Sequence, residues 1–276
     1  MTRPVAGSSA EAPASGLERI AEAFARARAE GRRAALMPYL MAGFPDLETS
    51  LRIGMAYVEG GADLVELGIP FSDPLADGPV IHQAATAALR AGVTVQHALD
   101  VGQQLAAHVP VVAMGYSNPI FARGPDRFLE ALSVASISGL IVPDLPLEEA
   151  GELRALCDAR GIALVPLAAP TTPDDRLARI GADARGFLYA VSVTGTTGER
   201  SRLDTMSQVV SRAAAHTHVP VAVGFGIATP EAAREALAAG ADGVIVGTRL
   251  VRAAGLEDDP VGAVRELMSS FAQALS

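Results

Sequence analysis

The sequence predicts an α/β fold, a single (β/α)8 barrel of the TIM type with an extra helix at its N-terminus. Eight short, mostly apolar segments recur along the 276 residues, and most are followed by a stretch with helical periodicity. Strands with such continuous apolar runs are buried on both faces, as in parallel sheets. No linker divides the chain, and its length suits one barrel. An open, doubly wound sheet is the alternative that these observations leave.

Each element follows from its local pattern. Residues 1–16 hold Pro, Ser and Ala without a continuous apolar run, so we expect a disordered tail ahead of one barrel domain over 17–276. Helical spacing over 17–30 predicts the extra helix, which we place at the bottom of the barrel. Strands are expected at 35–43, 63–68, 109–116, 139–146, 162–169, 186–192, 219–226 and 242–248. Helices are expected at 47–62, from near 80, and at 95–108, 125–135, 148–160, 173–181, 204–215, 230–239 and 259–274, with a helical turn at 249–254.

The composition argues against several classes of protein. The net charge is −9 and no run of Lys or Arg occurs, so neither nucleic acid nor a membrane surface is an expected partner. No apolar run reaches the roughly 18 residues that span a bilayer. The one cysteine, Cys157, cannot form an internal disulfide, which fits a cytoplasmic protein. No cluster of Cys and His predicts a metal site.

Two carboxylates in "VELGIPFSDPLADGP" (65–79) are the first candidates for chemistry. Glu66 ends an apolar strand, where desolvation should raise its pKa toward the range that proton transfer requires. Asp77 is returned toward the strand ends by a loop stiffened by prolines. The alternatives are that Glu66 pairs with an arginine and that Asp73 and Asp77 cap the next helix.

Glycine-rich loops after the last three strands predict a phosphate site. They are "VTGTTGER" (193–200), "GFGI" (224–227) and "GTR" (247–249). Glycines allow several backbone N–H groups to point at one anion, and a helix N-terminus adds its dipole. Tyr116 and Asn118 after the third strand, and Tyr189 on the sixth, are candidates to line the pocket. Packing in the core, with the hydroxyl bonded at the rim, is the alternative for the tyrosines.

The strand-2 stretch resembles the signature of the tryptophan synthase alpha subunit family. Further blocks resemble that family in the same order: "PYLMAGFPD" (38–46), "GYSNPI" (115–120), "GLIVPDLPLEE" (139–149), "YAVSVTGTTG" (189–198), "VAVGFGI" (221–227) and "DGVIVGTRLV" (242–251). The resemblance implies a lyase that splits indole-3-glycerol phosphate into indole and glyceraldehyde 3-phosphate by retro-aldol cleavage. It covers residues 17 to 274.

The resemblance also implies a role for each matching residue. Glu66 would be the general acid and base, and Asp77 would stabilise charge at the indole nitrogen. Tyr189 would lie beside Glu66, and Thr197 would belong to a mobile loop that contacts Asp77. The indole pocket would be lined by Tyr39, Met114 and Ile141, and the phosphate cradle would comprise Gly198, Gly224, Phe225, Gly226, Gly247 and Thr248.

The family further implies a partner. Its members work with a beta subunit that carries pyridoxal phosphate, as an alpha2-beta2 heterotetramer, and this chain itself would need no cofactor or metal. Pro70 and Asp73 in loop 69–79, and Asn118 after the third strand, would face that subunit.

Three other functions remain open at this stage. An autonomous lyase would keep the chemistry without the partner. Another phosphate-binding barrel enzyme, such as an isomerase, would account for the glycine loops but not for Glu66 and Asp77. A regulatory subunit without activity would need neither carboxylate. An assay of indole release, without and with a beta subunit, distinguishes the autonomous lyase from a synthase subunit that depends on its partner.

Overall fold

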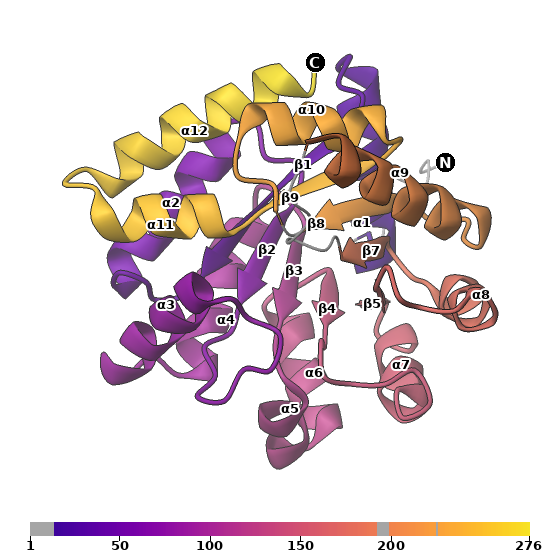
Figure 1. Ribbon diagram of the computed structural model, residues 1–276. Coiled ribbons are helices and arrows are strands. Elements are labelled where there is room, and N and C mark those ends of the chain that lie inside the picture. The colour runs from indigo at the N-terminus through magenta and orange to yellow at the C-terminus, as the bar shows by residue number, and fades with distance from the viewer. Residues whose placement is uncertain (1–13, 192–198, 225) are drawn as a thin grey trace, which may run out of the picture.

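The structure is a computed structural model that describes residues 14–191, 199–224 and 226–276. Figure 1 shows the strands gathered in the centre with helices around them. The described strands are β1 Ala35–Met41, β2 Val65–Gly68, β3 Val111–Met114, β4 Gly139–Ile141, β5 Ala163–Val165, β6 Leu167–Ala168, β7 Leu188–Val191, β8 Val221–Gly224 and β9 Gly243–Val246. They form one sheet in the order β5-β4-β3-β2-β1-β9-β8-β7-β6, and every pairing is parallel. The predicted TIM-barrel fold is confirmed.

The barrel closes through one residue, Pro166. The predicted fifth strand is split there into β5, which pairs with β4, and β6, which pairs with β7. Proline has no N–H to give to a neighbouring strand, so the ladder is interrupted at this position. Its carbonyl still accepts a hydrogen bond from the Tyr189 N–H at 3.0 Å. The two edges of the sheet are therefore joined by consecutive residues of the chain.

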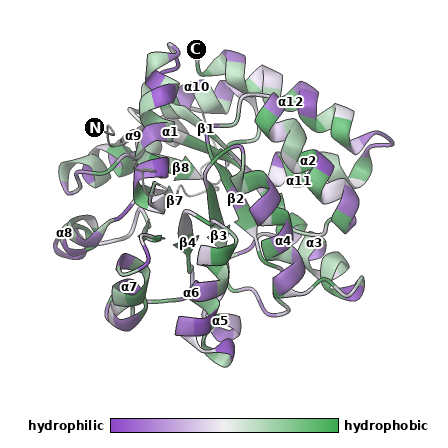
Figure 2. Ribbon diagram, turned by 180° about the vertical axis from the view of Figure 1, so that it is seen from behind, coloured by the Kyte–Doolittle hydropathy of each residue, from purple (hydrophilic) through white to green (hydrophobic). Residues whose placement is uncertain are grey.

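The helices surround the strands and turn their apolar faces inward. Their bounds are α1 Gly16–Ala29, α2 Leu47–Glu59, α3 Pro79–Arg90, α4 Val95–Ala106, α5 Ser117–Arg123, α6 Pro125–Val134, α7 Gly151–Asp158, α8 Asp174–Asp183, α9 Glu199–Ala215, α10 Pro230–Ala238, α11 Thr248–Leu256 and α12 Pro260–Ala274. Figure 2, from behind, shows mainly hydrophobic strands inside helices of mixed colour. A core of Ala, Val, Leu and Ile fills the space between strands and helices.

One helix was not predicted. Helix α5 follows β3 directly, in a stretch that contains Asn118 and Pro119. Its first N–H, on Ser117, is bound by the carboxylate of Asp144 at 2.9 Å. That carboxylate lies 27 residues further along the chain, so the local sequence carries no sign of the cap. Helix α11 is likewise a full helix where only a turn was expected.

The N-terminal helix α1 plugs the end of the barrel where the strands begin. It starts at a capping box in which the Ser15 hydroxyl and the Glu18 carboxylate each bond the other's backbone N–H. Ile20 and Phe24 are buried among the inward-facing residues of the strands. A Cβ on Gly243, at the start of β9, would come within 3.0 Å of the Phe24 ring. The opposite end of the barrel, where the strands finish, stays available for a site.

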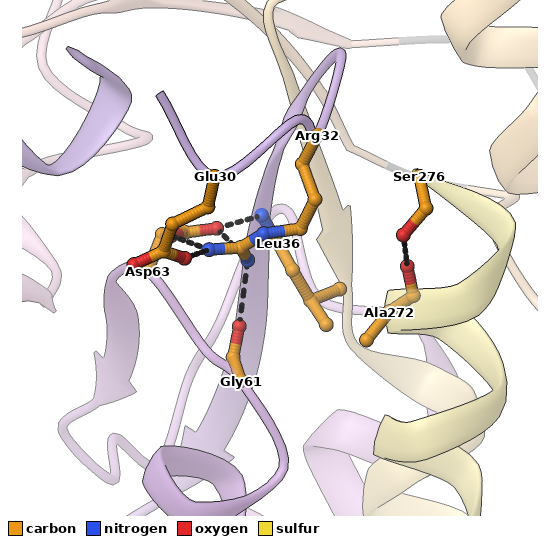
Figure 3. Close-up of polar contacts among 7 residues, drawn as sticks. All are labelled: Glu30, Arg32, Leu36, Gly61, Asp63, Ala272 and Ser276. Atoms are coloured by element: carbon orange, nitrogen blue, oxygen red, sulfur yellow. Dashed lines mark hydrogen bonds and ion pairs between the residues drawn. The ribbon is translucent and has the colours of Figure 1, made fainter. Parts of the chain in front are cut away.

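Two aspartates form ion pairs with arginines at the end of the barrel where the strands begin. Asp63, just before β2, accepts the Leu36 N–H at 2.8 Å and two hydrogen bonds from the Arg32 guanidinium, at 2.6 and 2.7 Å (Figure 3). Its side chain is 1% exposed. Asp242, just before β9, accepts a single hydrogen bond from Arg28 at 2.6 Å and is partly exposed. Both aspartates end a Gly-Ala-Asp sequence, and both arginines belong to α1 or the turn after it.

Candidate active site

Glu66 points into the barrel near the finishing end of β2. Side chains alternate along a strand, and here Val65 and Leu67 face the helices while Leu64 and Glu66 face inward. Glu66 lies opposite Tyr39 of β1 in the sheet register. It is 2% exposed, one of the few buried charged residues among those described. The sequence pattern therefore places a carboxylate in an apolar interior.

A cavity of about 340 Å³ opens in front of this carboxylate. Residues at the finishing ends of β1, β2, β3, β7, β8 and β9 meet around it, as expected for the site of a TIM barrel. It brings together the predicted residues Tyr39, Glu66, Asp77, Met114, Tyr189, Gly226, Gly247 and Thr248. It also contains residues to which the sequence assigned no individual role in the site: Gly78, Pro79, Ile81, Ile227, Ala228 and Ile245. Ile245 follows the inward alternation of β9 and could have been found from it.

Burial raises the pKa of Glu66 to about 8, and the negative charge of Asp77 adds to this effect. One of its oxygens, Oε2, has no hydrogen-bond partner among the described residues. A buried polar atom without a partner is costly unless a ligand or water completes it. At neutral pH the Glu66 side chain is thus mainly a neutral acid whose oxygen faces the cavity.

Asp77 is a different kind of carboxylate. Burial raises its pKa, while a hydrogen bond from Tyr116 and the positive charge of His82 act in the opposite direction. Its neighbours therefore favour the charged form, which those of Glu66 do not. Two carboxylates in different surroundings can take different roles, one exchanging protons and the other holding charge.

Two buried tyrosines complete the inner wall. Burial, followed by the charges of Asp77 and Glu66, raises the pKa of Tyr39 well above its usual range, and Tyr189 behaves similarly. Both hydroxyls therefore remain neutral. A Cβ on Gly68 would overlap the Tyr39 hydroxyl, and a Cβ on Gly224 would overlap that of Tyr189. Gly224 was placed in the phosphate cradle from the sequence. In the structure, the Tyr189 hydroxyl leaves no room for a side chain at this position.

The opposite wall offers backbone N–H groups. Helix α11 begins at Thr248, and its N-cap Gly247 supplies no side-chain cap. The positive end of the helix dipole therefore faces the cavity with uncapped amides. Gly226 approaches from the loop after β8 with φ of +79°, a conformation that favours glycine. The predicted cradle residues Gly198 and Phe225, and Thr197 of the predicted loop, lie outside the described residues.

The remaining predicted residues lie away from the cavity wall. Ile141 is fully buried in the barrel interior, and Tyr116 is 3% exposed with its hydroxyl against the loop after β2. Asp73 and Asn118 are exposed, whereas Pro70 is buried within this chain. The two exposed residues follow neighbouring strands on the same end of the barrel.

A larger cavity of about 440 Å³ lies beside β4 to β6, between α7 and α8. It is lined mostly by apolar residues, and its arginines Arg154 and Arg176 are already paired, with Asp183 and Glu148. It contains neither Glu66 nor Asp77, so we place the site in the smaller cavity. Within the described ranges, no group of three His, Cys, Asp or Glu could hold a metal ion. Among the described helices, none has the length and apolar character needed to cross a membrane.

Fold and cavity place the chain among the TIM-barrel proteins that have a small-molecule site where the strands end. The profile of the family described as "Tryptophan synthase alpha chain" matches residues 24–275. The chain belongs to the tryptophan synthase alpha chain family, and the resemblance drawn from the sequence is confirmed.

Curated relatives and solved structures agree with this membership. The chain is 51% identical to a tryptophan synthase alpha chain of Prochlorococcus marinus (strain MIT 9313), over 84% of this chain and 86% of the relative. It is 45% identical to one of Methanosarcina acetivorans, over 86% of each. A structure of Mycobacterium tuberculosis tryptophan synthase matches with a TM-score of 0.85 at 38% identity, over 93% of this chain and 98% of the other. The Legionella pneumophila alpha subunit matches with a TM-score of 0.84 at 36% identity, over the same shares.

Proposed function

We propose that the chain is a carbon–carbon lyase that splits indole-3-glycerol phosphate into indole and glyceraldehyde 3-phosphate, a step of tryptophan biosynthesis. The observation that carries this proposal is the pair of carboxylates in one cavity, Glu66 buried and Asp77 half-buried. Glu66 is neutral near pH 7 with one oxygen unpartnered among the described residues, while at Asp77 Tyr116 and His82 oppose the rise in pKa that burial causes. Retro-aldol cleavage of this substrate requires one proton donor and acceptor and one negative charge.

The chemistry follows from those two states. The Glu66 carboxylic acid donates its proton to C3 of the indole ring, and Asp77 stabilises the positive charge that develops at the ring nitrogen. The Glu66 carboxylate then accepts the proton of the adjacent glycerol hydroxyl. The oxygen forms the aldehyde C=O of glyceraldehyde 3-phosphate, while the bond between indole C3 and the carbon that bears this hydroxyl breaks and its electron pair returns to the ring. Glu66 thus gives one proton and takes one back, and the electron pair of the broken bond stays in the substrate.

The cavity wall supports the remaining contacts. Uncapped amides at the start of α11, together with Gly226, suit the phosphate group, and Tyr39, Met114 and Ile245 offer an apolar wall for the indole ring. We include Thr197, Gly198 and Phe225 in the proposed site because they match the family's motifs. No step in this scheme assigns a metal or cofactor to the chain.

We further propose that the chain works in the cytoplasm with a beta subunit, as an alpha2-beta2 heterotetramer that passes indole to pyridoxal phosphate on the partner. Support comes from membership of the family and from the exposed Asp73 and Asn118, which follow neighbouring strands beside the cavity. Pro70 is buried and stiffens the loop that carries Asp73.

The proposal is tested by measuring indole release from indole-3-glycerol phosphate, first with the isolated chain and then with a beta subunit added. We expect Glu66→Gln to slow release at least 100-fold, because an amide cannot donate or accept the transferred protons. Glu22→Gln on the exposed face of α1 is the matched control, and it should release indole at the wild-type rate. A normal rate for Glu66→Gln would show that the mechanism is wrong. No indole from the wild type, alone or with the partner, would exclude the function itself.

A further inference from the structure

Tyr116 faces the back of the loop that carries Asp77. It is the last residue before α5 and is 3% exposed. Its hydroxyl accepts a hydrogen bond from the Ala76 N–H at 3.1 Å, and Ala76 immediately precedes Asp77. We propose that Tyr116 is a positioning residue that holds this loop in place and so fixes how the Asp77 carboxylate is presented to the cavity.

The tyrosine contacts the loop at two points. Its ring stacks on Phe71, with centroids 5.3 Å apart and an angle of 28° between the planes. Its hydroxyl meets the backbone at Ala76, five residues further along. Between these points the loop is largely exposed, and Leu75 is 83% exposed. A segment with so little burial of its own depends on such contacts for its conformation.

The direction of the hydroxyl proton follows from a count of donors. A tyrosine hydroxyl has one proton and can accept through its lone pairs. Since the oxygen of Tyr116 accepts the Ala76 N–H, its own proton is free to be donated toward the Asp77 carboxylate, an interaction that lowers the pKa of Asp77 against the effect of burial. A charged carboxylate accepts this bond better than a protonated one. The same hydroxyl thus fixes the backbone and favours the anion.

Tyr116 is itself held from its other side. The next residue, Ser117, donates its N–H and its hydroxyl to the two oxygens of Asp144, at 2.9 and 2.6 Å. Asp144 follows β4, so three consecutive strand ends are linked through the backbone at 116 and 117. The titratable groups that act on Asp77 or feel its charge are Tyr116, His82, Glu66, Tyr39 and Tyr189. Among these, Tyr116 is the hydrogen-bond donor that favours the charged form of Asp77.

The test is Tyr116→Phe, which keeps the stacked ring and removes only the hydroxyl. The inference rests on the proposed function, so one readout is independent of activity: the Asp77 pKa from carboxyl-labelled NMR, with the resonance assigned by Asp77→Asn. We expect this pKa to rise, kcat for indole release to fall about tenfold with KM little changed, and the acid limb of the pH profile to move to higher pH. Tyr57→Phe is the matched control. It loses a buried hydroxyl that bonds the Tyr39 carbonyl at 3.2 Å and should leave the Asp77 pKa unchanged.

The outcomes separate cleanly. An unchanged Asp77 pKa and an unchanged kcat in Tyr116→Phe would overturn the inference, whatever the loss of stability. If the wild type released no indole, the proposed function would fail, while the NMR titration would still decide whether Tyr116 acts on Asp77. Phe71→Leu, which leaves the hydroxyl in place, provides a second variant should Tyr116→Phe not fold. It should shift the pKa in the same direction by less, and no shift would contradict the proposed hold on the loop.

Discussion

The buried Glu66 predicts a pH dependence of stability opposite to that of an ordinary carboxylate. Its pKa rises from 4.5 to about 8 on folding, mainly through burial. In the unfolded chain the group ionises above pH 4.5, whereas in the folded protein it keeps its proton up to about pH 8. Its contribution to stability is therefore fully present below pH 4.5 and is lost as the pH rises toward 8. At 1.36 kcal/mol per pKa unit, the loss is about 5 kcal/mol.

Glu66→Gln isolates this effect, because an amide has nearly the shape of the neutral acid and does not titrate. We expect the free energy of unfolding of the wild type to fall relative to the variant by several kcal/mol between pH 5 and pH 8. Urea unfolding followed by circular dichroism at several pH values measures the difference. Glu148→Gln is the matched control. Hydrogen bonds from Arg176 lower the pKa of that exposed carboxylate, so its effect should stay constant over the same range.

A difference between wild type and Glu66→Gln that stays constant from pH 5 to pH 8 would refute the assignment of Glu66 as a neutral acid. The pH at which the difference levels off gives the folded pKa directly. The contribution of Asp77, the second cause of the shift, follows from repeating the comparison in an Asp77→Asn background. If burial dominates, most of the pH dependence should survive there.

Two further substitutions test the supporting structure. Gly68→Ala would place a methyl group on the Tyr39 hydroxyl and should lower the free energy of unfolding, measured with urea, by about 1–3 kcal/mol. Gly115→Ala is the control: its Cβ would have its nearest neighbour at 3.6 Å, so its free energy of unfolding should fall clearly less. Asp63→Asn would remove the charge that faces Arg32 at the bottom of the barrel and should cost about 3 kcal/mol, measured by urea unfolding at pH 7; a change below about 0.5 kcal/mol would show that the buried pair adds little.

Much of the fold could be predicted because the signal is local. Parallel strands of a barrel are buried on both faces, so each is an apolar run that the sequence shows directly. The strand boundaries are less visible, since the expected strand at 162–169 is broken at Pro166 into two pieces that pair with different neighbours. Helix α5 was not predicted because its first N–H is bound by Asp144, which lies nearby only in the folded chain.

The site could be predicted as far as chain position determines it. The finishing ends of the strands meet at one end of a barrel, so Glu66, Asp77, Gly247 and Thr248 were expected to be neighbours, and they line one cavity. Chain position does not determine which way a side chain turns after its strand has ended. Tyr116 follows β3 by two residues and was expected at the pocket wall, yet its hydroxyl bonds the neighbouring loop.

The two glycines Gly224 and Gly247 show why a glycine motif alone is ambiguous. Each ends a strand or follows one, and in the sequence both suit a phosphate cradle. In the structure a Cβ on Gly224 would collide with the Tyr189 hydroxyl, so the neighbouring tyrosine already accounts for the glycine. A Cβ on Gly247 would meet nothing nearer than the Tyr39 Cβ at 3.6 Å, an ordinary contact. No described residue excludes a side chain at this position. We therefore attribute that glycine to the ligand, because a side chain would obstruct the ligand's approach to the amides of α11.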